Sequence, residues 1–501
     1  MLPTGRGPWS GCTSPAERRP LPATLSAAVL LLYTAVLFGV AWIASRRIHD
    51  FSDYLVAGRN LGVPLASLSL LATWFGAGTL LASAEEVRAV GLSAAALEPI
   101  GPGICLLLVG LFYAAPLRRA GLLTLGDFFA RRFGRRAEIA CAAIMVPSFF
   151  GWIAAQFSVL AVLLGELFGI PAGAGLALVA AVAVGYTLIG GMWSVTLTDA
   201  VQGVIVVLAL LALGVSAVAE LGGGSLAGGL ARLGRETPPD LLAVVPGELT
   251  ALLAWSGLLV AGALGNIPGQ DVLQRVFSSR TERVARRACL IAGSLYLVLG
   301  AIPVVLGLAT RLLLPGQEGD MLAALGRILF SPLATLGLVL LVVSALLSTV
   351  DSALISAASV LAQNLLRHSL PRAGLLRLSR LSVLIVGAAS LFYAFRGLSA
   401  YSLLEDAYEL TLVGLFVPLT AGLFWKRGGR TAALAAMACG VVLWVVHLSF
   451  GWDWFLAPAL APAGVLVPKA IGLTAASAAG YLAGAAFDGP EPEPMPEGGA
   501  R

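Results

Sequence analysis

Charged residues are scarce in this chain of 501 residues, where Asp, Glu, Lys and Arg together make up 12% of the sequence. A soluble domain carries about 25% charged residues. Hydrophobic residues make up 58% of the chain, so too few charges remain to cover the surface of a water-soluble protein of this length. Lipid is therefore the expected surrounding for most of the chain.

Cysteine and histidine are also rare, with five and three copies. The cysteines form no CxxC pair, four of them lie in apolar runs, and the histidines share no motif. These absences exclude a disulfide framework and a structural zinc site. The net charge of +5 does not indicate nucleic-acid binding, because the arginines that carry it lie in short loops between apolar runs.

A polar segment of domain size is missing as well. The longest stretch between apolar runs covers about 220–248 and is rich in Gly and Pro. No paired nucleophile and base and no metal-ligand cluster occurs, so the sequence does not predict an enzyme. Residues 1–22 and 487–501 have the composition of disordered tails, which leaves 23–486 as one transmembrane domain.

Long apolar runs are what the chain has in abundance, and they predict an all-α, polytopic membrane protein with thirteen transmembrane helices. The Gly190-Gly191 pair is the only break between the fifth and sixth runs. The expected spans are 23–45, 63–83, 91–115, 137–167, 170–190, 193–219, 249–270, 284–311, 332–363, 376–396, 400–424, 430–450 and 464–486.

The basic residues gather in alternate loops, at about 46–59, 118–136, 275–287, 367–380 and 426–430. Loops rich in Lys and Arg stay in the cytoplasm. This pattern predicts a multi-pass protein of the inner (plasma) membrane with the N-terminus outside and the C-terminus inside. That orientation requires an odd number of spans, in agreement with thirteen.

The run 332–363 carries hydroxyl side chains at steps of three and four, which places them in one stripe along a helix. Asp351 and Thr349 flank this stripe. Hydroxyl and carboxylate oxygens in this pattern suit Na⁺, whereas close helix packing through small residues is the alternative explanation. A carboxylate in mid-membrane favours an ion or proton site. The serines of the stripe are Ser344, Ser348, Ser352, Ser356 and Ser359.

Two apolar runs are interrupted by glycine and proline. The first contains Gly76 and Gly78, and the second ends in Gly265, Pro268 and Gly269. Broken helices in corresponding positions of two halves indicate an inverted-repeat transporter whose site lies near mid-membrane. A small-residue packing seam is the alternative for the first break.

Several other polar or aromatic residues lie within the predicted spans and are candidates for contact with a solute. Asp199 lies too deep for an interface, and Glu98 either lines a cavity or is an ordinary interfacial acid. The candidates for solute binding are Trp74, Glu98, Trp152, Gln156, Asn266 and Gln270.

Six ordered motifs between about 51 and 430 resemble the sodium:solute symporter family, which includes proline, galactose, sialic acid and choline carriers. They are FSDYLVAGR from Phe51, TWFGAGT from Thr73, TLGDFF from Thr124, YTLIGG from Tyr186 with Thr198-Asp199 and Gln202 beyond it, Gln274-Arg275, and LSTVDS from Leu347. The chain looks most similar to the choline-carrier branch. Trp74 and Trp152 match two positions of that branch's aromatic cage, whereas Pro102 and Gly269 stand at the other two.

The resemblance implies the leucine-transporter fold, a 5+5 inverted repeat with one extra N-terminal and two extra C-terminal helices. It also implies Na⁺ as the coupling ion. The implied ligands are the carbonyls of Ala72, Phe75 and Ala345 and the hydroxyls of Ser348 and Thr349. A second sodium, present in some members, would use Asp199, Ser348, Asp351 and Ser352.

The resulting prediction is sodium-coupled symport of a small organic solute, such as an amine, amino acid, sugar or carboxylate, by alternating access. Two alternatives remain open at this stage. Asp199 or Asp351 could carry a proton in a proton-coupled carrier, or the chain could be a non-transporting sensor built on a symporter body. The sequence does not decide the oligomeric state.

Overall fold

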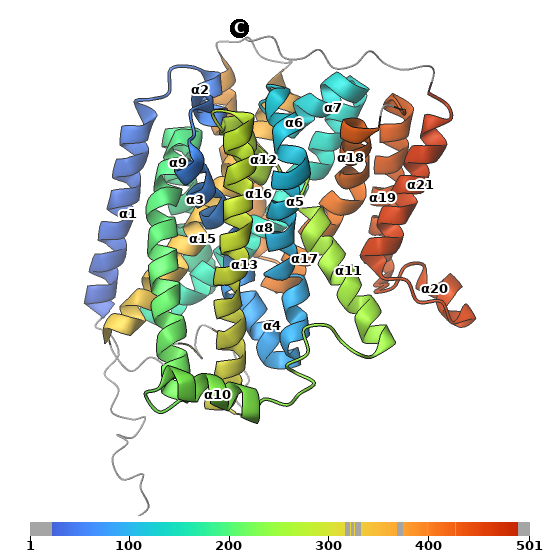
Figure 1. Cartoon of the computed structure of the whole chain (residues 1–501). Coiled ribbons are helices and arrows are strands. Elements are labelled where there is room, and N and C mark those ends of the chain that lie inside the picture. Colours follow the sequence, from blue (N-terminus) through green and yellow to red (C-terminus); the bar gives the residue numbers. More distant parts are fainter. Residues whose placement is uncertain are drawn as a thin grey trace, which may run out of the picture.

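The computed structural model describes residues 23–315, 321, 325, 332–367, 374–397, 399–425 and 427–488. The expected tails therefore lie outside the described residues, apart from Phe487 and Asp488. Figure 1 shows a bundle of helices that runs mostly in one direction, with short helices across its ends. In this view α1 begins at the bottom and α21 ends at the top.

The helices of the first half alternate between long spans and short pieces at breaks and in loops. They are α1 (Ala23–Ser45), α2 (Phe51–Val56), η2 (Ala57–Arg59), α3 (Val63–Trp74), η3 (Gly78–Ala82), α4 (Ser83–Val90), η4 (Leu92–Ala96), α5 (Ile100–Leu108), η5 (Val109–Tyr113), α6 (Ala114–Arg119), α7 (Leu125–Phe133), α8 (Arg135–Phe168), α9 (Ala172–Leu221) and α10 (Leu226–Glu236).

The second half repeats this alternation. Its helices are α11 (Leu249–Gly265), α12 (Gln270–Ser278), α13 (Glu282–Leu313), α15 (Pro332–Val360), η6 (Leu361–Leu366), α16 (Leu375–Ala394), α17 (Ala400–Thr411), η9 (Leu412–Phe416), α18 (Val417–Phe424), α19 (Arg430–Phe450), α20 (Ala457–Leu460), η10 (Ala461–Ala463) and α21 (Lys469–Ala485).

Among the described residues, ten helices are long and apolar enough to cross a membrane, or eleven if the bent pair α3 and η3/α4 counts as one span. Thirteen spans were expected, and the two that this count does not add lie in α9, which counts once, and in α21, which is not counted. Helix α9 contains 50 residues and leaves helical geometry at Gly191, where φ is 51° and ψ is −151°. Helix α21 contains 17 residues, which corresponds to a length of roughly 25 Å.

Gly191 shows why α9 changes direction there. Its backbone lies against Tyr54, so that a methyl group on Gly191 would lie 2.6 Å from the Tyr54 ring. The positive φ and this close approach both favour glycine. The break expected at Gly190-Gly191 is therefore present as a kink within one continuous element.

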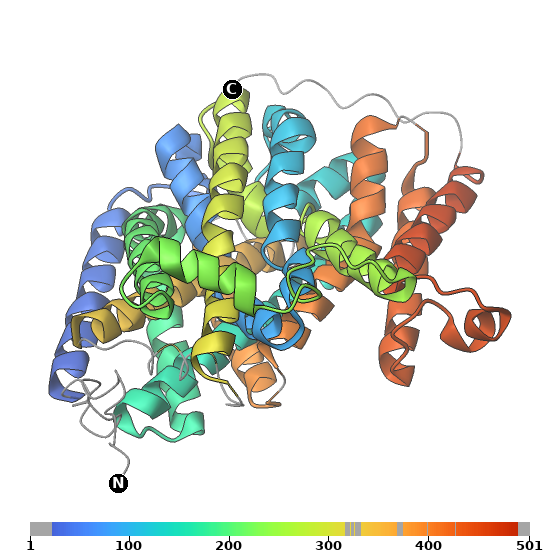
Figure 2. The same ribbon diagram turned by 60° about the horizontal axis from the view of Figure 1, so that its bottom comes forward.

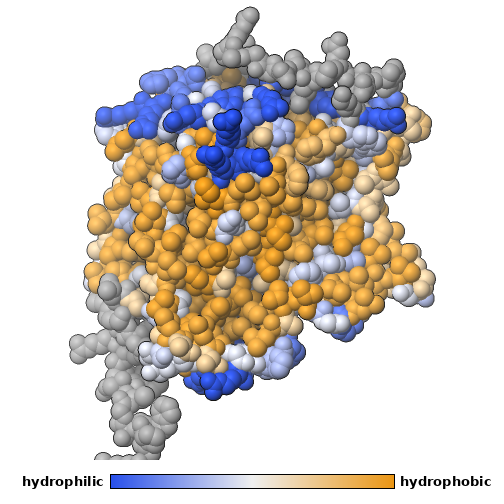
Figure 3. Space-filling model, in the orientation of Figure 1, coloured by the Kyte–Doolittle hydropathy of each residue, from blue (hydrophilic) through white to orange (hydrophobic). Residues whose placement is uncertain are grey.

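A broad apolar belt covers the face of the molecule shown in Figure 3, with hydrophilic residues above and below it. The exposed large hydrophobic residues belong to the long helices, as Leu31, Leu208, Val298 and Phe392 illustrate. Such a surface is expected where lipid tails, rather than water, contact the protein. The chain is thus a multi-pass membrane protein, as its composition predicts.

Helix α15 forms the centre of the bundle and is almost entirely buried. It packs against α3, α8, α9 and α16. Helices α19 and α21 pack against each other and form one edge of the molecule in Figure 2, whereas α1 lies at the opposite edge. The two broken helices, α3 with η3 and α11 with α12, both adjoin the centre.

Candidate ion and solute site

The break in the first broken helix lies directly beside α15. Helix α3 ends at Trp74, and the chain resumes at Gly78 with a bend of 60°. Phe75 lies at the break, with φ −81° and ψ 63°. This conformation frees backbone carbonyls from helical hydrogen bonds, and such groups persist in a membrane protein only where they contact polar partners.

The serine stripe of α15 supplies those partners. Ser348 Oγ lies 2.9 Å from the carbonyl oxygen of Ala72 and 2.8 Å from that of Ala345. Thr349 Oγ1 lies 3.0 Å from the same Ala345 carbonyl. Four of the five oxygens expected to bind sodium therefore meet, and all four belong to residues with 0% exposure.

Gly76 brings this break close to Thr349 and Gln156. A methyl group on Gly76 would lie 2.7 Å from Thr349 Oγ1 and 2.8 Å from Gln156 Oε1. Gln156 Oε1 accepts a hydrogen bond of 2.7 Å from the Ala77 amide. Gln156 therefore fixes the unwound backbone instead of facing open space.

The second expected sodium position contains a buried arginine. Arg275 from α12 forms a fully buried ion pair with Asp199, with 3.1 Å between Nη2 and Oδ2. The same Nη2 donates to Ser352 Oγ, and Nε donates to Ser69 Oγ at 3.1 Å. Two of the four expected ligands, Asp199 and Ser352, are thus bridged by a guanidinium group.

The other two members of that expected set lie on the same helix. Asp351 accepts from Thr198 Oγ1 at 3.3 Å and forms no ion pair with any described residue. Ser348 belongs to the first site. The sequence contains Gln274-Arg275 as a motif, but nothing in its spacing predicts that Arg275 reaches Asp199, because α9 and α12 meet only in the folded bundle.

A small cavity lies on the other side of the breaks, between α8, the α11/α12 break and α17. Its free volume is about 20 Å³, which is close to the minimum needed for one water molecule. An organic solute can enter only if the surrounding side chains move. The lining residues include Phe149, Trp152, Asn266, Asp271 and Tyr408.

Asp271 is the functional candidate that the sequence analysis missed. It stands in the first turn of α12, directly after the second break, and is 3% exposed. Its Oδ2 accepts a hydrogen bond from Trp74 Nε1. A carboxylate one residue into a helix that follows a mid-membrane break is the signal that could have identified it.

Glu98 lies in a cluster of hydroxyl groups near this cavity. Thr79 Oγ1 and Tyr296 Oη donate to its Oε2 at 2.8 and 3.0 Å. Tyr408 Oη donates to its Oε1 at 2.6 Å. Glu98 is 2% exposed, so it is not an interfacial acid. Its contact with the cavity runs through Tyr408.

The six residues expected to contact solute thus lie in four kinds of place. Trp152 and Asn266 line the cavity, and Trp74 and Glu98 are bonded to residues that line it. Gln156 holds the first break. Gln270 lies elsewhere, because its side chain accepts from the Leu125 amide at 2.8 Å and donates to the Leu123 carbonyl at 3.4 Å.

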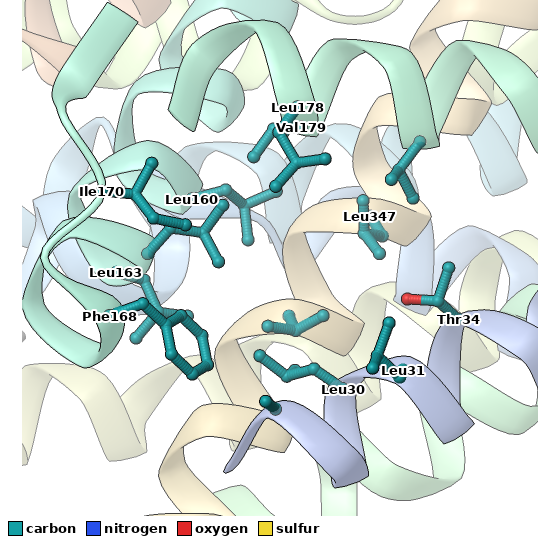
Figure 4. A pocket seen from close by; sticks show the side chains of 14 residues that line it. Leu30, Leu31, Thr34, Leu160, Leu163, Phe168, Ile170, Leu178, Val179 and Leu347 are labelled. Carbon is teal, nitrogen blue, oxygen red and sulfur yellow. The ribbon is translucent and has the colours of Figure 1, made fainter. Parts of the chain in front are cut away.

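A larger cavity of about 360 Å³ opens between α1, α8, α9 and α15. Figure 4 shows its side chains, which are aliphatic or aromatic apart from Thr34. It offers almost no group that could orient a polar solute. Its walls match the apolar belt, so we assign it to lipid contact and not to transport.

A family model described as the sodium:solute symporter family matches residues 54–440. The human high affinity choline transporter 1 is 28% identical over 448 residues, which cover 83% of this chain and 75% of that protein. The high-affinity proline transporter of Bacillus subtilis (strain 168) is 28% identical over 439 residues, with coverage of 83% and 91%.

Solved structures share the fold. A Na⁺-coupled sialic acid symporter in a substrate-bound outward-open state superimposes with a TM-score of 0.78 at 17% identity, covering 93% of this chain and 98% of the other. A nucleobase-cation-symport-1 family transporter in a closed conformation gives a TM-score of 0.60 at 14% identity, with coverage of 87% and 94%. These are carriers of the leucine-transporter fold.

Proposed function

Because this chain belongs to the sodium:solute symporter family, we propose that it carries a small organic solute into the cell together with sodium, by alternating access. The observation that carries this proposal is the contact between the first break and α15. The carbonyls of Ala72 and Ala345 and the hydroxyls of Ser348 and Thr349 converge there. Oxygen ligands of this kind suit a small hard cation.

The same contact explains how sodium could couple to a conformational change. Helix α3 and helix α15 meet through one hydroxyl–carbonyl contact, between Ser348 and Ala72. A cation bound by both helices would hold them together and favour the state in which they touch. Its release would let the helices separate and would change access to the neighbouring cavity.

The available driving force is adequate for accumulation. A membrane potential of about 100 mV contributes about 2.3 kcal/mol per charge. A tenfold sodium gradient adds about 1.4 kcal/mol. Together they allow roughly 500-fold accumulation of a neutral solute for each sodium ion that enters.

We propose thirteen spans arranged as two inverted repeats of five. The kink at Gly191 divides α9 into two spans, and α21 is long enough to serve as the last one. The broken helices α3/η3 and α11/α12 then become the first span of each repeat. Helix α1 precedes the repeats, and α19 and α21 follow them, which fits their places at opposite edges of the bundle (Figure 2).

Asp351 supports a second candidate, proton coupling. Its carboxylate is fully buried and forms no ion pair with a described residue, so a proton or a second sodium would neutralise it. Transport that depends on pH and not on Na⁺ would favour the proton. Sodium dependence with a Hill coefficient above 1 would favour a second ion.

The first experiment titrates NaCl against the purified protein at constant ionic strength, with KCl as the balancing salt. We expect a saturable, Na⁺-specific rise in thermal stability and a change in tryptophan fluorescence, because Trp74 adjoins the site. The double variant Ser348→Ala/Thr349→Ala should lose this response.

A matched control removes two hydroxyls elsewhere. Thr187 and Thr196 are buried threonines whose hydroxyls bond only to their own helix. Thr187→Ala/Thr196→Ala should therefore keep the sodium response. If the Ser348/Thr349 variant responds to Na⁺ as the unmodified protein does, the proposed sodium site is wrong.

A further inference from the structure

Three hydroxyl groups that line the small cavity between α8, the α11/α12 break and α17 already donate their protons to the protein, whereas the Asn266 amide and the Trp152 indole carry N–H groups there. The hydroxyl of Ser148 donates its proton to the Met145 carbonyl at 2.7 Å, and that of Thr411 donates to the Gly265 carbonyl at 2.7 Å. Tyr408 donates its proton to Glu98. These three cavity-lining hydroxyls can therefore offer only lone pairs to a solute.

Asp271 adds a negative charge to this set of acceptors. Trp74 Nε1 donates to Oδ2, and Asp271 forms no ion pair with a described residue. The positive end of the α12 dipole stabilises the charged form of this carboxylate, whereas its burial opposes that form. A buried carboxylate that lines a cavity without a basic partner is stabilised by a donor of opposite charge.

Gly269 makes room for this carboxylate. A methyl group on Gly269 would lie 2.6 Å from Asp271 Oδ1, so any larger residue at this position would displace the acid. Phe149 and Trp152 provide the aromatic side of the cavity, and their ring centroids lie 5.8 Å apart.

The balance of buried charges in the core also favours a cationic solute. Its buried carboxylates are those of Glu98, Asp199, Asp271 and Asp351, and its one buried basic side chain is Arg275, counted over the described residues. The other buried acids have their own basic partners, Glu138 with Arg135 and Glu409 with Lys469. With all four acids ionised, one or two sodium ions would leave negative charge uncompensated, and a cationic solute would offset it.

From this geometry we infer that the solute is an organic cation that carries N–H groups, of the primary or secondary amine class, and that Asp271 binds its charged nitrogen. This inference rests on the proposed symport function and specifies its substrate class. The ring faces of Phe149 and Trp152 would pack against the cation's carbon atoms. A solute carboxylate would lie beside the Asp271 carboxylate, and this like-charge contact disfavours amino acids and sugar acids.

The test compares four probes that share a two-carbon alcohol: ethanolamine, N,N-dimethylethanolamine, choline and ethylene glycol. Ethanolamine is a cation with three N–H groups, N,N-dimethylethanolamine is a cation with one, choline is a cation with none, and ethylene glycol is uncharged. Thermal stability of the full-length protein is measured with each probe in NaCl and in KCl. We expect affinity to fall in this order and ethanolamine to bind at least tenfold more tightly than choline, with binding that is stronger in NaCl.

Two variants connect the effect to the carboxylate. Asp271→Asn keeps the shape and the acceptor for Trp74 but removes the charge, and a hydrogen bond to a charged group is worth enough for a loss of roughly 10- to 100-fold in ethanolamine affinity. Asp240→Asn removes an exposed acid outside the bundle and should change nothing. The sodium response of Asp271→Asn serves as the folding control.

Each alternative outcome overturns the inference. These outcomes are tighter binding of choline than of ethanolamine, equal binding of ethylene glycol, unchanged amine affinity in Asp271→Asn, or no amine binding at all. If any of them occurs while Na⁺ still stabilises the protein, the substrate class is wrong and the symport proposal stands. If Na⁺ has no effect on the unmodified protein, the symport proposal fails. The probe series in KCl then still measures the affinity of the cavity for each of the four probes.

Discussion

At the scale of single residues, the Arg275–Asp199 ion pair is a fully buried electrostatic contact of the core. Both side chains are 0% exposed. Removal of one partner from a buried pair leaves an uncompensated charge and costs about 3–5 kcal/mol. We therefore expect Arg275→Met to lower the melting temperature of the purified protein strongly.

A double-mutant cycle separates the charge effect from lost packing. Asp199→Asn combined with Arg275→Met removes both charges, so it should recover much of the stability that Arg275→Met alone loses. Arg280→Met, at an exposed arginine of the next loop, should have little effect. Equal losses in the single and double variants would show that the pair contributes nothing as a pair.

Single residues also show which contacts of the candidate site could be predicted from the sequence. The expected sodium ligands follow from the resemblance to the sodium:solute symporter family, and the structure brings four of the five together. That they bind sodium stays a prediction. The long-range contacts of Arg275 and Asp271 could not be derived from the sequence. Their partners, Asp199 and Trp74, lie 76 and 197 positions away, and only the packing of α12 against α3 and α9 creates the contacts.

At the scale of elements, the break in α3 depends on the lack of a side chain at Gly76. An added methyl group would collide with Thr349 Oγ1 and Gln156 Oε1, at 2.7 and 2.8 Å. Overpacking of this kind costs about 1–3 kcal/mol. We expect Gly76→Ala to push the break away from α15 and to weaken sodium affinity about tenfold, as measured by the NaCl titration.

Gly39→Ala provides the matched control, because Gly39 lies inside α1 and has no atom within 4 Å of the added methyl group. This variant should keep the sodium response and gain slightly in helix stability. A Gly76→Ala protein with unchanged sodium affinity would mean that the break does not need to approach Thr349.

A second element-scale feature is the contact of Asn364 in η6 with the first turn of α7 and with α8. Asn364 accepts from Thr124 Oγ1 at 2.7 Å and donates to Asp127 and Glu138 at 3.1 and 2.8 Å. We expect this contact to open in the proposed alternating-access cycle. Asn364→Ala should therefore raise hydrogen exchange in α7, whereas Asn60→Ala, at an exposed loop residue, should not; equal exchange in both would show that α7 is held by other contacts.

The order of the long helices, and most of their ends to within a few residues, could be predicted from the sequence, because lipid imposes long apolar runs whose ends carry charge. The kink of α9 and the bend after α3 were marked by glycines in the sequence. The short helices α2, α7, α10 and α12 were not expected. They are too short or too polar to form spans. Neighbouring spans hold them in place: α9 packs against α2 and α10, α8 against α7, and α3 and α15 against α12.

At the scale of the whole molecule, the orientation in the membrane follows from the distribution of arginine. The α6–α7 and α12–α13 connections lie at the upper end in Figure 1, with α10 at the opposite end. Figure 3 shows a broad hydrophilic band at that upper end and a smaller one below. Because basic loops stay in the cytoplasm, we expect the upper end to face the cytoplasm and α10 to lie outside.

Reporter fusions test this orientation directly. Alkaline phosphatase, which is active only outside the cytoplasm, should be active when inserted between α10 and α11 and inactive when inserted at Arg280. Green fluorescent protein, which fluoresces only when it folds inside, should fluoresce when fused after Asp488. The reverse pattern would refute the orientation. Fluorescence at the C-terminus with a phosphatase-positive Arg280 loop would instead place these two points on different sides. An odd number of spans would then separate them, as happens if the 17-residue α21 fails to cross the membrane.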